Sequence, residues 1–224
     1  MKILLQVLLI CSQISLQLAA QELPPIGSWR EHLPFNNAIG VAVESSVYCA
    51  TPYGFFAYDP AGASFDRKTK INGLNEVRVR LMKKDPQSDQ IALVYENANI
   101  DFLDGDEVIN LPDVWQSTVS GDRTAYGLFW EGSNLHLCTG LGIIVLDTKK
   151  YEVKDTYRPS STGVDIRVDN LVSLNGFYFA ATAEGLMTAA AGASNLADFR
   201  AWQTIAGNGL SSGPVQNLAV LNNA

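Results

Sequence analysis

The feature that most constrains the fold is a short phrase that the chain repeats four times. Each copy follows an apolar run, and the first residues of successive copies lie 45, 43 and 43 positions apart. The copies are Thr51-Pro52-Tyr53-Gly54, Glu96-Asn97-Ala98-Asn99, Thr139-Gly140-Leu141-Gly142 and Thr182-Ala183-Glu184-Gly185. A period of about 40 to 45 residues is the length of one four-stranded propeller blade. The spacing therefore predicts an all-β chain built from repeated blades.

Each phrase lies between two short segments with the composition of strands. Gly or Asn at its fourth position suits a backbone with positive φ. In three copies an aspartate that suits an Asx-type turn ends the second segment, namely Asp59, Asp104 and Asp147. The hairpin is preceded by a third apolar segment and followed by a fourth, more polar one, which in the last unit is Phe199–Thr204.

Four strands joined by short turns form an antiparallel blade. Helices are expected to be minor or absent, because no sustained i, i+3, i+4 pattern occurs after the first twenty residues. The predicted blades lie near 36–70, 75–112, 122–158 and 165–205.

The two ends of the repeated region indicate whether the ring of blades is complete. Trp29 and Trp202 lie 173 positions apart, close to four repeats, which predicts that Trp29 stands on a single outer strand whose blade is completed elsewhere. Residues 217–224 align without a gap to 170–177, so a fifth blade is expected to begin over 213–224. The chain is therefore expected to be the N-terminal fragment of a longer protein with a closed ring.

Residues 1–20 have the pattern of a secretory signal peptide. Lys2 is followed by the apolar run Ile3–Ile10 and, after a tapering stretch, by the small residues Ala19 and Ala20. Glutamines interrupt the segment, which is too short to span a bilayer. Residues 21–224 are therefore expected to form an exported partial propeller domain.

Composition excludes several functions. The chain has 23 Asp and Glu against 16 Lys and Arg, and loss of Lys2 with the signal peptide makes the balance more acidic. An acidic chain is unsuited to nonspecific binding of nucleic acid or to a polybasic membrane patch. Cys49 and Cys138 fall on opposite faces of strands two blades apart, so we expect buried free thiols rather than a disulfide.

The residues predict no catalytic, cofactor or metal site. His32 and His136 have no nucleophile elbow or metal cluster beside them, so both are expected to be structural or surface residues. Asp101, Asp104, Asp106 and Glu107 lack the ordered spacing of a calcium loop and are interpreted as solvated turn carboxylates. Gly140 and Gly142 belong to a β-turn, since the third glycine and helix of a phosphate site are missing.

Ligand-binding residues stay unknown at this level, although two features indicate where to look. The tryptophans at 29, 115, 130 and 202 could stack on sugar rings, but their recurrence on strand positions favours packing between blades. Insertions between repeating strands tend to form the binding face of a propeller. Three segments have that character: Trp115–Arg123, Arg158–Asp165 and Gly207–Pro214.

The repeat also resembles known families. A Gly-Leu pair and a valine before the phrase, as in Gly73-Leu74 with Val77, resemble the propellers of two-component regulators. A longer series of phrases, in order through nearly the whole of 21–224, is similar to the N-terminal propeller of the PorZ family of type IX secretion components in Bacteroidetes. The phrases include Ile26–Arg30, His32–Pro34, Asn36–Ala38, Tyr48–Thr51, Asn99–Asp101, Ile109–Asp113, Gly121–Asp122, Cys138–Ile143, Val145–Asp147 and Lys154–Tyr157.

The PorZ resemblance implies a non-enzymatic protein on the cell surface with two seven-bladed propellers and a C-terminal β-domain. It implies an attachment complex with the sortase PorU and with PorV and PorQ, in which anionic lipopolysaccharide is bound and presented to the sortase. By the repeat count, this chain is expected to contain only part of one such propeller. The alternative resemblance implies a periplasmic sensor domain of a hybrid two-component regulator that recognises a polysaccharide.

Overall fold

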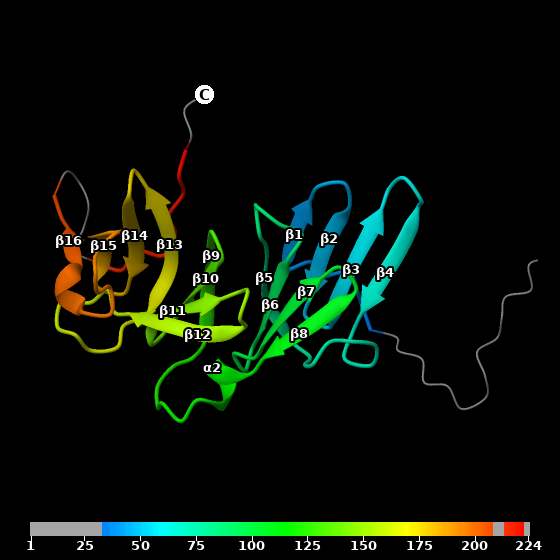
Figure 1. Ribbon diagram of the computed structural model, residues 1–224, viewed down its shortest axis with the longest axis horizontal. Helices are drawn as coiled ribbons and strands as arrows, with labels where there is room; N and C mark the ends of the chain where they lie inside the picture. The colour runs from blue at the N-terminus through cyan, green and yellow to red at the C-terminus, as the bar shows by residue number, and fades with distance from the viewer. Residues whose placement is uncertain (1–32, 208–212, 222–224) are drawn as a thin grey trace, which may run out of the picture. The chain divides into compact units, whose positions relative to one another are not determined.

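The computed structural model describes residues 33–207 and 213–221, and its strands form four separate four-stranded sheets (Figure 1). Every sheet is antiparallel, and its strands follow one another in chain order. The predicted all-β fold of four-stranded blades is therefore confirmed. The predicted signal peptide, Trp29 and His32 lie outside the described residues.

The four sheets follow one another along the chain. The first blade contains β1 (Gly40–Val43), β2 (Val47–Thr51), β3 (Gly54–Asp59) and β4 (Ser64–Lys68). The second contains β5 (Val79–Lys84), β6 (Ile91–Tyr95), β7 (Ile100–Asp104) and β8 (Glu107–Leu111). The third contains β9 (Ala125–Glu131), β10 (Asn134–Thr139), β11 (Gly142–Asp147) and β12 (Glu152–Tyr157). The fourth contains β13 (Val168–Leu174), β14 (Phe177–Thr182), β15 (Gly185–Ala190) and β16 (Gln203–Ile205).

Helix is minor, as predicted: the described residues include the single turn α2 (Asp113–Gln116) and the 3-10 turn η2 (Phe199–Ala201). The predicted last strand over Phe199–Thr204 is wrong in its first half. Asp198 accepts a hydrogen bond from the amide of Arg200 at 3.0 Å and caps the η2 turn. The chain is extended again from Trp202, and β16 begins at Gln203.

The repeated phrase is a turn closed by its threonine. Thr139 Oγ1 donates to the carbonyl of Gly142 at 3.0 Å and accepts from the amide of Leu141 at 3.1 Å. Thr51 and Thr182 make the same pair of bonds in their own blades. A hydroxyl can donate and accept at once, so one side chain satisfies two backbone groups that the turn leaves unpaired.

The predicted positive φ at the fourth position is confirmed in two copies and wrong in two. Gly142 and Gly185 have φ of +114° and +128°. In the second blade the left-handed residue is Ala98, one position earlier, and Gly54 keeps a negative φ. Gly54 is required for another reason, because a Cβ there would lie 2.8 Å from the carbonyl oxygen of Lys68.

The Asx turns are confirmed at Asp59 and Asp147, each of which accepts bonds from two backbone amides that follow it. For Asp104 no such bond is found among the described residues. Its two-residue turn relies on Gly105, whose φ is +57°. Glycine adopts that conformation without the steric cost that a side chain brings.

The cores of the domain lie between blades. One buried cluster joins the first and second blades, a second joins the second and third, and a third joins the third and fourth. Side chains from the two blades share each cluster, for example Phe55 with Leu93, Phe102 with Trp130, and Ile143 with Met187. A sheet hides both apolar faces only when a neighbour packs on each side.

Residues 213–221 carry no assigned strand. The amide of Val215 donates to the carbonyl of Thr182, and Asn170 Nδ2 donates to the carbonyl of Leu218 at 3.5 Å. These bonds hold the segment against the fourth blade. The fifth blade over 213–224 stays a prediction.

Candidate functional site

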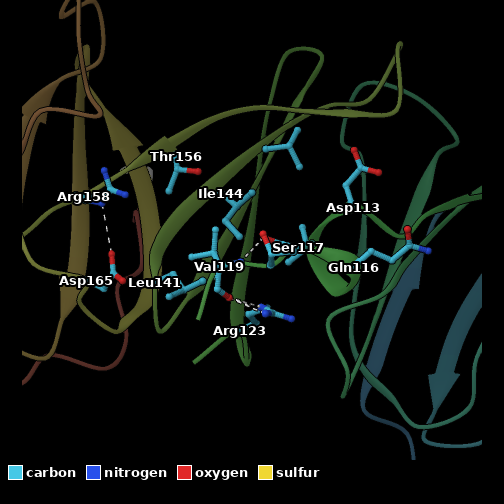
Figure 2. A pocket seen from close by; sticks show the side chains of 13 residues that line it. Asp113, Gln116, Ser117, Val119, Arg123, Leu141, Ile144, Thr156, Arg158 and Asp165 are labelled. Carbon is cyan, nitrogen blue, oxygen red and sulfur yellow. Dashed lines mark hydrogen bonds and ion pairs between the residues drawn. The ribbon is translucent and has the colours of Figure 1, made fainter. Parts of the chain in front are cut away.

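A cavity of about 540 Å³ lies beside the third blade, where two inserted connections meet (Figure 2). Its volume is within the range of small-molecule sites, about 300 to 1,000 Å³. One wall is formed by α2 and the loop after it, and the other by β11, β12 and the connection 158–165. The cavity is therefore a candidate binding site.

The single turn of α2 positions the first wall. The amide of Gln116 donates to the carbonyl of Pro112 at 2.8 Å, and Pro112 occupies the N-cap position. Val114 is 3% exposed and belongs to the core between the second and third blades. This anchor leaves Asp113, Gln116 and Ser117 at the cavity.

Arg123 fixes the loop that follows α2. Its Nε and Nη2 donate to the carbonyl of Val119 at 3.2 and 2.6 Å, and its Nη1 donates to the carbonyl of Trp115 at 3.1 Å. No ion pair of Arg123 is found within the described part of the chain. The guanidinium therefore holds the loop in place beside the cavity through bonds to backbone carbonyls.

The opposite wall combines apolar and polar groups. Leu141, Ile144 and Val153 supply aliphatic side chains from the third blade. Arg158 Nε lies 3.4 Å from Asp165 Oδ1, and Figure 2 shows this pair on the side of the cavity away from Asp113 and Gln116. The cavity thus offers an apolar surface bordered by charges of both signs.

Three further side chains face the cavity with free hydrogen-bonding capacity. No hydrogen bond of the side chains of Gln116, Thr118 and Thr156 is found among residues 33–207 and 213–221. An amide and two hydroxyls can both donate and accept. They are therefore available to a ligand.

Two of the three connections that are expected to form a binding face line this cavity, and their role in binding stays a prediction. Segments 115–123 and 158–165 both contribute side chains to the cavity. The third segment, 207–214, lies largely outside the described residues. The contributions of Ile144 and Val153 were missed, because in the sequence they look like any other strand residue.

The tryptophans divide between packing and surface. Trp130 and Trp202 are each 5% exposed within inter-blade cores, as predicted. Their ring nitrogens donate to the carbonyls of Lys83 and Leu196. Trp115 differs, because it is 44% exposed on α2 next to the cavity.

Asp101 was wrongly interpreted as a solvated turn carboxylate. It is 0% exposed and accepts from the backbone and side-chain nitrogens of Asn75, both at 2.9 Å. Asn110 Nδ2 donates to it at 2.8 Å, and the Tyr95 hydroxyl donates at 2.5 Å. Burial, together with this carboxylate, raises the pKa of Tyr95. Asp104, Asp106 and Glu107 are exposed, as predicted.

The two cysteines are free and buried, as predicted. Burial raises the pKa of the Cys138 thiol to about 12 and that of Cys49 above its ordinary value. The thiolate is the reactive form of cysteine. Both side chains therefore act as small apolar groups.

His136 is structural, as predicted, and sits where the third and fourth blades meet. It is 1% exposed and surrounded by the rings of Phe129, Tyr157 and Tyr178. Nδ1 lies 3.3 Å from the carbonyl of Phe129, whereas Nε2 is buried without a hydrogen-bond partner. Burial is the main cause that lowers the pKa of this imidazole, against the opposing effect of Glu131.

We expect acid to weaken the protein through His136. A lowered pKa means that the folded state binds fewer protons than the unfolded state, so this contribution is full above about pH 6.5 and is lost as the pH falls below it. The loss is at most about 1.4 kcal/mol per pH unit. Urea midpoints at about pH 7.5 and 5.5 should shift more in the parent than in His136→Phe. Equal shifts in both proteins would contradict the expectation.

Comparison with known proteins identifies the family of this propeller. A family model described as the type IX secretion PorZ N-terminal beta-propeller domain matches residues 47–203. The chain belongs to the PorZ N-terminal β-propeller family. The matched range of this PorZ-type propeller includes both walls of the cavity.

Solved structures agree on the fold. PorZ, an essential bacterial surface component of the type IX secretion system of Porphyromonas gingivalis, is 21% identical with a TM-score of 0.69 over 78% of this chain and 23% of that chain. The extracellular domain of the putative one component system BT4673 from B. thetaiotaomicron is 14% identical with a TM-score of 0.58, over 77% and 24%. The PorZ-type chain therefore spans about a quarter of the length of each. No curated protein matches it.

Proposed function

We propose that the chain is part of a non-enzymatic surface component of a type IX secretion system. In this proposal the protein joins the attachment complex with the sortase PorU and with PorV and PorQ, binds anionic lipopolysaccharide or a related glycan, and supports the sortase that modifies cargo. The observation that carries the proposal is the match of the PorZ family model to residues 47–203.

The chemistry of the described residues supports a binding role. Among them no group of three or more His, Cys, Asp or Glu side chains could hold a metal ion. His136 is enclosed by aromatic rings and cannot reach a substrate, and both thiols are buried. We therefore propose recognition without turnover.

Export is part of the same proposal. The pattern of residues 1–20 is that of a signal peptide, and the two similar structures are described as a surface component and an extracellular domain. No described helix is long and apolar enough to cross a membrane. We propose the cell surface as the location, with the periplasm as the alternative, and a propeller that continues in a fifth blade.

Affinity capture tests the proposal. The full-length tagged protein, purified from the outer membrane of its own bacterium after mild solubilisation, should carry the sortase and at least one other attachment protein. An untagged strain processed in parallel controls for carry-over. Recovery of the tagged protein without any of these partners would count against membership in the complex.

A sensor domain is the second candidate, because two of the similar structures belong to a putative one component and a putative hybrid two component system. The sequence encoded beyond Ala224 separates the two functions. A transmembrane helix followed by kinase motifs would favour the sensor, whereas more propeller and a β-sandwich would favour the secretion component.

A further inference from the structure

We propose that the cavity between α2 and the third blade binds one sugar residue of a polysaccharide chain. The inference deepens the proposed function and rests on it for the larger molecule that carries the sugar. The chemistry of the cavity itself selects the sugar, through its charges, its apolar wall and its fixed loop.

The charged groups call for a ligand that donates and accepts. Arg123 and Arg158 carry guanidinium N–H groups at the cavity, and Asp113 and Asp165 carry carboxylates, of which Arg158 and Asp165 are paired with each other at 3.4 Å. A hydroxyl group can accept from the first kind and donate to the second. An array of neighbouring hydroxyls therefore satisfies both kinds, whereas a purely anionic or purely cationic ligand satisfies one.

The apolar wall fits the other property of a sugar ring. Leu141, Ile144 and Val153 supply aliphatic side chains on one wall, Thr156 lies on the same strand as Val153, and Gln116 lines the facing wall. A pyranose has C–H faces and hydroxyl edges, so it can cover the apolar wall while its edge reaches polar side chains. Sites of this kind combine an apolar lining with a few placed polar groups.

The site is held in shape before a ligand arrives. Val114 anchors α2 in the core, and Arg123 ties the next loop to two of its own carbonyls. Binding to a fixed site loses less conformational entropy than binding to a loop that must first become ordered.

A peptide strand fits this wall less well. β12 is the outer strand of its sheet, so its free edge is the place where a peptide would add. That edge carries Glu152, Lys154 and Asp155, and a register shift between Val145 and Leu146 disturbs its pairing with β11. Charges and bulges are the means by which edge strands avoid further pairing.

A second cavity of about 570 Å³ provides an internal control. It is lined by Asp85, Gln87 and Asp104 from the second blade and by Ser133 and Tyr151 from the third. Gln87 is exposed, like Gln116. Replacing either glutamine with leucine makes the same chemical change at the two cavities.

The test measures binding of the full-length protein to polysaccharide from the outer membrane of its own bacterium, freed of lipid and labelled with a fluorophore. Fluorescence anisotropy of the parent gives the reference affinity. Gln116→Leu combined with Thr156→Val should raise Kd by about tenfold or more, since two hydrogen bonds are lost. Gln87→Leu should stay within about twofold, and unchanged urea midpoints would show that the variants are folded.

Each other outcome has a meaning. Parent-like binding by the double variant, or a loss confined to Gln87→Leu, would overturn the cavity assignment, while capture of the sortase would leave the proposed function standing. Binding of intact lipopolysaccharide without binding of the lipid-free chain would overturn the sugar and indicate the lipid anchor. Displacement of the label by cargo peptides instead of by unlabelled polysaccharide would also overturn it.

Discussion

Asp101→Ala is expected to lower the free energy of unfolding by about 3 to 5 kcal/mol. Asp101 lies at 0% exposure and accepts four hydrogen bonds, from the amide and Nδ2 of Asn75, from Asn110 and from Tyr95. Alanine leaves the Tyr95 hydroxyl, which is 0% exposed, without this acceptor, whereas Asn75 is exposed and Asn110 is half-buried. Unpaired buried donors keep their full desolvation cost.

Urea unfolding followed by tryptophan fluorescence measures the loss. Asp104→Ala is the matched control, because it removes an exposed carboxylate from the end of the same strand. Its effect should stay within about 0.5 kcal/mol. Equal losses from the two variants would show that the buried network contributes nothing special to stability.

Gly142→Ala is the second substitution with a large expected effect. A Cβ at this position would lie 2.4 Å from the carbonyl oxygen of Tyr157, and the residue has φ of +114°. The oxygen is backbone of the neighbouring strand, so relief requires movement of β12 itself. We expect a loss of about 3 kcal/mol from the combination of backbone strain and overpacking.

Substitutions at two other glycines distinguish backbone strain from overpacking. Gly132 has φ of +56° and no atom within 4 Å of a built Cβ, so Gly132→Ala should cost only the conformational part, about 1 kcal/mol. Gly192 has neither feature, and Gly192→Ala should be close to neutral. Thermal unfolding of the three variants should rank them in that order. A neutral Gly142→Ala would mean that the close approach is easily relieved.

The fold was predictable because its determinants are local and repeated. The side chains of Thr139 and Asp147 accept hydrogen bonds from backbone amides only a few positions away. Both partners of each bond therefore lie within one short stretch of sequence. Asp101 was not predictable in this way, since its partner Asn75 lies 26 positions upstream. In the sequence it is one more carboxylate near a turn.

The cavity was predictable in part for the same reason. Inserted lengths at 115–123 and 158–165 stand out against a regular repeat, and both reach the cavity. Ile144 and Val153 belong to regular strands, and only their positions in the folded blade show that they line it. Positive φ was predicted at Asn99 but occurs at Ala98. The repeat pattern does not reveal such a one-residue shift in turn geometry.

The three inter-blade clusters give each blade only its immediate neighbours as energetic partners. A destabilising substitution in one inter-blade cluster should therefore affect only the two sheets that share that cluster. Hydrogen exchange would show this as a local loss of protection. The same arrangement means that a blade can be added or removed during evolution with few changes elsewhere. An added blade needs only two sheet faces that pack against its two neighbours.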